Sequence, residues 1–165
     1  MKCLAIETST NFCSVALSID GRNRVEEALA PRLHGELVLQ SVDRLLKQQG
    51  LTGQQLDIIA CGRGPGAFTG VRMAIGIVQG LAFAWNKKVM PVSSLACLAQ
   101  QCCDENKSEQ YVAVVQDARM GDVYWAVYAL KDGAVTEVVK EALSKPEQLN
   151  FPEHSELLCV GSGIG

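Results

Sequence analysis

The N-terminal part of the chain alternates between apolar and polar positions as β-strands do. Lys2–Glu7 and Phe12–Ile19 each have the length and composition of a strand, and a polar turn separates them. Asp20-Gly21 then gives a strong hairpin signal, and a third strand is predicted at 24–30. The chain is therefore expected to open with an antiparallel meander.

The apolar spacing becomes helical after Pro31, which marks a break and can begin a helix. A helix is predicted at 32–49, with Gly50 as its C-terminal cap. The apolar residues of one face of this helix are Leu33, Leu37, Val38, Val42, Leu45 and Leu46. The elements expected next are a buried strand at 56–61, a helix at 69–85, a strand at 89–92 and a helix at 95–103.

The order strand, turn, strand, Asp-Gly hairpin, strand occurs a second time. After a charged break at 103–110, the predicted strands are 111–116, 123–130 and 134–140. This repetition indicates an α/β fold with a duplicated β-β-β-α-β-α unit, although the two copies differ in sequence.

We accordingly expect two lobes, at 1–107 and 108–165. The last predicted strand begins at Leu157 and runs into a glycine turn, where the chain stops. The second lobe is therefore expected to be incomplete, with a C-terminal part missing.

The predicted helix at 69–85 is almost free of charge. Arg72 and Gln79 are its only long polar side chains, and Gly76 and Gly80 form a G-x-x-x-G pair. A helix that covers one face of a sheet needs a single apolar stripe, and an exposed glycine is unfavourable in a helix. We therefore expect this helix to be covered on two sides, by the sheet and by another helix or subunit.

Composition narrows the classes of protein. The chain is 48% hydrophobic and carries a net charge of -3, which argues against autonomous binding of nucleic acid. The seven cysteines are irregularly spaced, no signal sequence is recognised, and no apolar run is expected to span a membrane. These features predict a cytoplasmic protein with reduced cysteines.

Two turns have residues that could hold a phosphate. In ETSTNFCS (7–14), Glu7 could orient a metal-bound water while Thr8 and Ser9 contact the phosphate. In GRGPGAFTG (62–70), the glycines precede a helix, but the lysine of a P-loop is absent. The alternatives are a polar hairpin turn and a tight strand-to-helix connection, and both remain open.

Other candidate chemistry is sparse. His34 and His154 are the only histidines, and their separation gives no metal-ligand spacing. The turn at 117–121 lacks a glycine after Asp117, so a turn held by an Asp117–Arg119 pair is the simpler interpretation. No nucleophile with a paired base can be identified.

Four motifs together resemble the TsaB (YeaZ) family of bacteria: AIETST with CSVAL, GRGPGAFTGVRMAIGIVQGLAFA, PVSSLACLA and DARMGDVYWAVY. The resemblance covers essentially the whole chain in the same order. It implies the sugar kinase/Hsp70/actin-like (ASKHA) fold, which agrees with the duplication above.

The resemblance further implies a role in making N6-threonylcarbamoyladenosine at position 37 of tRNA. In this family the partners are a catalytic paralogue of the TsaD type and an ATPase of the TsaE type, so tRNA is met only through the complex. TsaD-type proteins carry an H-x-x-x-H pair, and the matching region here, VMPVSSLACLAQ, has no histidine. The resemblance therefore implies a non-catalytic subunit without metal or intrinsic cofactor, with ATP or ADP only at an interface with partners.

Pairing in this family uses helices of the N-terminal lobe, with TsaD or with a second copy as a homodimer. The resemblance thus assigns the interface to the helices at 32–49 and 69–85. The residues expected in or beside it are His34, Val38, Val42, Arg72, Met73, Gly76, Ile77 and Gly80. The alternative function is a small-molecule ATPase or kinase of the same fold; a metalloprotease has little support because H-E-x-x-H is absent.

Overall fold

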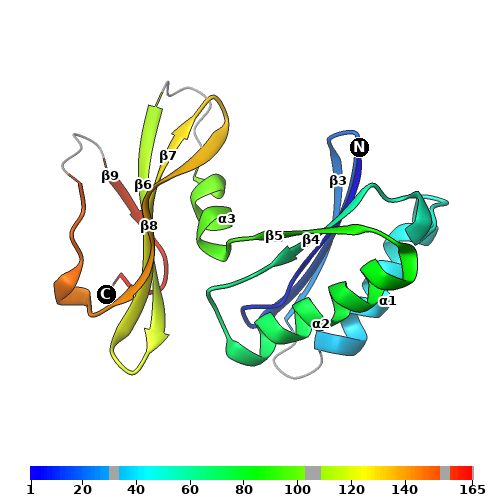
Figure 1. The fold of residues 1–165 in the computed structure, drawn as a ribbon, viewed down its shortest axis with the longest axis horizontal. Helices are drawn as coiled ribbons and strands as arrows, with labels where there is room; N and C mark the ends of the chain where they lie inside the picture. Colours follow the sequence, from blue (N-terminus) through cyan, green and yellow to red (C-terminus); the bar gives the residue numbers. More distant parts are fainter. Residues whose placement is uncertain (30–33, 103–108, 153–156, 165) are drawn as a thin grey trace. The chain divides into compact units, whose positions relative to one another are not determined.

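The structure, a computed structural model, describes residues 1–29, 34–102, 109–152 and 157–164, and it divides into two compact units (Figure 1). The first unit is Met1–Val92 and the second is Ser93–Gly165. The observed boundary, between Val92 and Ser93, comes earlier than the boundary predicted after residue 107. The prediction differs because it assigned the third helix to the first lobe. That helix, α3 (Ser94–Gln101), instead buries Leu95 and Ala99 against the sheet of the second unit.

The first unit is a five-stranded mixed sheet with the strand order β3-β2-β1-β4-β5. The expected meander forms its antiparallel part, from β1 (Lys2–Glu7), β2 (Phe12–Ile19) and β3 (Arg22–Leu29). The strands β4 (Ile58–Gly62) and β5 (Lys88–Val92) continue the sheet in parallel from β1. The third strand begins earlier than predicted, since Asp20 and Gly21 alone form the left-handed turn.

Both helices of the first unit cover the same face of this sheet (Figure 1). They are α1 (His34–Gln48) and α2 (Phe68–Trp85), and the short helix η1 (Gly53–Gln55) lies between α1 and β4. The inward-facing strand residues are Leu4, Ile6, Cys13, Val15, Leu17, Ile59 and Cys61. Gly50 has the positive φ expected of the cap after α1, whereas Pro31 and Leu33 lie outside the described residues.

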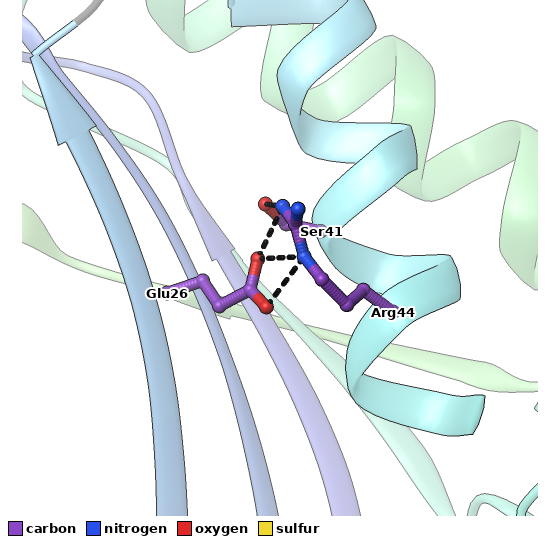
Figure 2. Close-up of polar contacts among 3 residues, drawn as sticks. All are labelled: Glu26, Ser41 and Arg44. Carbon is purple, nitrogen blue, oxygen red and sulfur yellow. Dashed lines mark hydrogen bonds and ion pairs between the residues drawn. The ribbon is translucent and has the colours of Figure 1, made fainter. Parts of the chain in front are cut away.

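An ion pair fastens α1 to the edge strand β3. The guanidinium group of Arg44 donates to both carboxylate oxygens of Glu26 over 2.8–3.0 Å, and Ser41 lies beside it (Figure 2). These hydrogen bonds from Arg44 hold the pKa of Glu26 below its usual value. The pair thus satisfies the charge of Glu26, which lies opposite the core residue Val15 on the helix-covered face of the sheet.

The second unit is a four-stranded sheet with the strand order β8-β7-β6-β9. Its strands are β6 (Glu109–Arg119), β7 (Asp122–Lys131), β8 (Ala134–Ser144) and β9 (Leu157–Val160). One face is covered by α3, and the hydroxyl oxygen of Ser93 caps this helix by accepting the backbone amides of Leu95 and Ala96. Leu149 and Phe151, which follow the short helix η2 (Pro146–Gln148), pack on the other face.

The two sheets repeat one topology, which confirms the duplicated α/β fold. Each has three antiparallel strands in meander order, followed by a parallel strand beside the first. In each, a glycine directly follows the part of the parallel strand that pairs with the first strand: Gly62, the last residue of β4, and Gly161, the residue after β9. A Cβ atom at Gly161 would overlap the backbone carbonyl of Val115 in β6, whereas one at Gly62 would overlap the carboxylate group of Glu7 at the end of β1.

Candidate functional site

The two candidate phosphate turns contact each other at the carboxyl ends of the neighbouring parallel strands β1 and β4. The hydroxyl of Thr8 donates to the carbonyl of Gly70 over 2.8 Å, and the amide of Ala67 donates to the carbonyl of Ser9 over 2.7 Å. Thr8 and Ser9 are both buried. The turn after β1 is therefore clamped onto the turn that leads into α2.

Close packing accounts for two glycines of the second turn. A Cβ atom at Gly66 would lie 2.6 Å from the Cβ of Ser9, and one at Gly70 would overlap the carbonyl oxygen of Thr8. Only Gly64 needs the left-handed backbone, with φ of 83°. Gly66 and Gly70 thus allow the turn at 7–9 to pack closely against the turn at 62–70. In a phosphate-binding loop, glycines at such positions would instead allow a ligand to approach the backbone.

The structure brings the predicted residues Glu7, Thr8 and Ser9 together, but polar groups of these residues form hydrogen bonds within the chain. A carboxylate oxygen of Glu7 accepts the amide of Ser9, and Thr8 is committed to Gly70. No group of three or more His, Cys, Asp or Glu side chains suitable for a metal ion occurs among the described residues. This arrangement favours the tight strand-to-helix connection over the phosphate site.

Three cysteine thiols of the first sheet are poorly suited to nucleophilic chemistry. Burial raises the pKa of Cys61, and the charge of Glu7 raises it further. Burial likewise raises the pKa of Cys3 and of Cys13. A raised pKa leaves less thiolate, which is the reactive form of cysteine.

One face of α2 packs on the sheet. Gly70, Ala74, Val78 and Ala82 recur at the spacing of one helical face and are buried. The helix ends at Asn86, which has a left-handed backbone and donates its amide to the carbonyls of Ala82 and Phe83. The sheet therefore accounts for one apolar stripe of this helix.

The opposite face of α2 is uncovered within the described chain. A Cβ atom at Gly76 or Gly80 would meet no other atom within 4 Å. Phe83 is 91% exposed and Phe68 is 70% exposed, and the guanidinium group of Arg72 lies 3.3 Å from the Phe68 ring centroid. The expected cover over the glycine pair is thus absent from the described residues, which leaves a bare strip of backbone bordered by aromatic side chains.

We call this strip, with its bordering residues Phe68, Arg72, Gly76, Gly80 and Phe83, the open face of α2. This face exposes two aromatic rings and two glycines to water and carries one charged side chain. Single exposed apolar residues are common on protein surfaces, whereas an extended apolar surface marks an interaction site. By length and composition α2 could also cross a membrane, contrary to the sequence-based expectation, and 22% of it is buried in the chain. One such helix is weak support for a membrane span, and the packing of Ala74, Val78 and Ala82 on the sheet is that of a globular unit.

The predicted interface residues divide into four groups, of which the buried pair Val38 and Val42 is described below. Arg72, Gly76 and Gly80 are exposed on the open face. Met73 and Ile77 are half-buried beside it, and Met73 lies against the start of α1, close to Gly35. His34 begins α1, but its side chain lies outside the described residues.

Val38 and Val42 do not belong to the surface. They are 0% and 3% exposed and lie in the core between α1 and the sheet. The sequence pattern identified them as apolar helix residues without showing what they contact. In the structure they face the sheet. Phe68 and Phe83 were not among the predicted interface residues, although an aromatic residue near each end of an apolar helix is a usable signal.

Comparisons with known proteins agree in pointing to one family. Residues 26–159 match the family model described as TsaD, tRNA N6-adenosine threonylcarbamoyltransferase. The tRNA threonylcarbamoyladenosine biosynthesis protein TsaB of Escherichia coli (strain K12) is 41% identical, over 99% of this chain and 72% of its own length. The protein of the same name from Haemophilus influenzae is 38% identical, over 97% of this chain and 71% of its own length.

A solved structure gives the same result. YeaZ from Pseudomonas aeruginosa superimposes with a TM-score of 0.90 and 45% sequence identity. The match covers 98% of this chain and 76% of that one. The likeness therefore extends through both units, at a sequence identity that supports more than a shared fold.

Proposed function

The chain belongs to the TsaB family of tRNA threonylcarbamoyladenosine biosynthesis proteins, and on that premise we propose that it is a non-catalytic subunit that binds a TsaD-type paralogue. The observation that carries this proposal is the open face of α2. It joins bare backbone at Gly76 and Gly80 to the exposed ring of Phe83. Small residues allow a second helix to approach closely, and an aromatic side chain at the border can anchor it.

A non-catalytic role agrees with the residues that could do chemistry. The chain has two histidines, and no histidine lies in the segment where TsaD-type proteins carry their pair. The hydroxyl of Thr8 is turned inward, and burial raises the pKa of Cys61. These features support a subunit that acts by binding.

The same face is proposed to pair two copies of the chain when no paralogue is present. A closed two-fold dimer buries one patch on both copies, and the open face is a single patch on one element. A TsaE-type ATPase is proposed as a further partner in the cytoplasm, with ATP or ADP only at an interface between subunits. tRNA is then met through the complex, in keeping with a net charge of -3.

The test is Gly76→Arg, which places a long charged side chain in the bare strip. We expect this variant to bind a purified TsaD-type partner at least about tenfold more weakly than the wild type, measured by calorimetry. Thr136→Arg, at an exposed position of β8 in the second unit, is the matched control and should bind normally. Unchanged binding of Gly76→Arg with an intact fold would remove the open face from the interface.

The alternative from the sequence, a small-molecule ATPase or kinase, is tested separately. The isolated chain is titrated with ATP and Mg²⁺, and Glu7→Ala is titrated beside it. Tight binding that Glu7→Ala abolishes would favour the alternative. We expect no such binding, because the turn at 7–9 is filled by the turn at 62–70.

A further inference from the structure

The hairpin between β6 and β7 has an unusual tip. Arg119, Met120 and Gly121 have φ angles of 66°, 56° and 77°, so three successive residues are left-handed. Residues with a side chain adopt this backbone at an energetic cost, which glycine avoids. Two of the three positions nevertheless carry long side chains.

The other two tight hairpins among the described residues have turn residues that adopt positive φ at lower cost. Their left-handed residues are Asp20 and Gly21 between β2 and β3, and Asp132 and Gly133 between β7 and β8. Asp-Gly is the pair that such turns favour, because both residues tolerate positive φ. Turn formation alone therefore does not explain arginine and methionine at the third tip.

The strained tip is held in place from several sides. The amide of Arg119 donates to a carboxylate oxygen of Asp117 over 2.8 Å, so the turn predicted to rest on an Asp–Arg side-chain pair is held through the backbone. Lys145 forms an ion pair with Asp122 over 2.8 Å and donates to the carbonyl of Met120 over 3.5 Å. At the base, the amide of Asp117 donates to Ser162.

These supports present two side chains to solvent. Met120 is 95% exposed, more than any other large hydrophobic residue in the part of the chain that the structure describes. The guanidinium group of Arg119 is exposed, with no hydrogen bond or ion pair to the described residues. A fixed backbone lowers the entropy lost on binding, and methionine adapts its shape to an apolar pocket.

We propose that this tip, Arg119–Met120, is a second contact site, distinct from the open face of α2, for a protein with an apolar pocket edged by carboxylates. Met120 enters the pocket and Arg119 pairs with its acidic edge. A protein is favoured over nucleic acid because the tip is not a basic patch: Asp117 and Asp122 balance Arg119 and Lys145. The inference rests on the proposed function in one respect, namely that the partner is a component of the assembled tRNA-modifying complex.

Met120→Gly tests the tip, because glycine removes the side chain and relaxes the left-handed backbone together. We expect the isolated variant to melt at the same or a higher temperature than the wild type. In the complex reconstituted with the TsaD-type and TsaE-type proteins, we expect its assembly to weaken roughly tenfold. Asp132→Gly, which makes the same kind of change at another left-handed turn, should assemble normally.

A photo-crosslinking amino acid at position 120 identifies what the tip contacts, with position 132 as the control. A cross-link from 120 to one of the protein components supports the proposal. A cross-link to tRNA, or normal assembly of Met120→Gly, would overturn it while leaving the open face of α2 untouched. If the wild type itself does not assemble with these proteins, both this inference and the proposed function fall.

Discussion

Glycine has two opposite roles in α2. Gly70 is buried, and a Cβ atom there would overlap the carbonyl oxygen of Thr8. Gly80 lies in the same helix with open space around it. Packing within the chain thus requires Gly70, whereas no packing contact among the described residues requires a glycine at position 80, where the backbone is exposed.

This contrast predicts opposite effects of one substitution. Gly70→Ala should lower the free energy of unfolding by about 1–3 kcal/mol or more, because the added methyl group overpacks a buried contact. Gly80→Ala should raise it by roughly 1 kcal/mol, because alanine is the better helix former. Urea denaturation of both variants checks this prediction. Equal effects of the two would contradict the assigned packing.

If the bare strip receives a partner helix, the more stable Gly80→Ala should also bind that partner more weakly. Such a trade of stability for binding would explain why an unfavourable residue occupies an exposed helix position.

At the scale of elements, the helices are fastened to the sheet by different means. α2 is held by apolar burial and by the turn at 62–70, whereas α1 adds the ion pair between Arg44 and Glu26 on the edge strand β3. An edge strand has neighbours on one side only, so a link to the covering helix helps to define its position.

This link predicts a pH-dependent difference between the wild type and Glu26→Gln. The hydrogen bonds from Arg44 lower the pKa of Glu26 in the folded state, so their stabilising effect is present above the unfolded-state pKa of about 4.5. The effect is lost as the pH falls through the lower folded-state value. The wild type should therefore be slightly more stable than Glu26→Gln near pH 7.

Thermal unfolding of both proteins from pH 7 to pH 3 provides the measurement. The difference in stability should shrink below about pH 4.5, where Glu26 becomes protonated in the unfolded chain. A difference that stays constant across this range would show that the carboxylate is not stabilised by Arg44.

At the scale of the whole molecule, the open face of α2 and the hairpin tip lie in different units. The open face belongs to Met1–Val92 and the tip belongs to Ser93–Gly165. Two separate contact surfaces suit a subunit that binds more than one protein. Because they lie in different units, a substitution in one surface can be tested without disturbing the unit that carries the other.

Phe83→Asp tests the proposed self-pairing of the chain. The ring is 91% exposed, so its removal should leave the stability of the monomer nearly unchanged. Placing a carboxylate in the shared patch should weaken the dimer at least about tenfold, since each copy would present the same charge. Sedimentation equilibrium over a range of concentrations measures the effect. Val138→Asp, which replaces an exposed apolar residue of β8, is the control and should not alter association.

The sequence by itself determined the types of the elements and their duplication. Alternation in Phe12–Ile19, helical spacing after Pro31 and the Asp-Gly turns are local signals, and each reports a periodicity or a backbone preference within a few residues. The chain's motifs likewise placed it in its family without reference to contacts.

Only the tertiary structure decided which surfaces are free. Val38 and Gly76 both lie on apolar stretches of helix, yet one is enclosed by the sheet and the other is bare. The burial of Thr8 depends on Gly70, far along the chain, and α3 joins the second unit through contacts with β6 and β7. Such contacts arise from the approach of distant segments, which no local pattern of residues encodes.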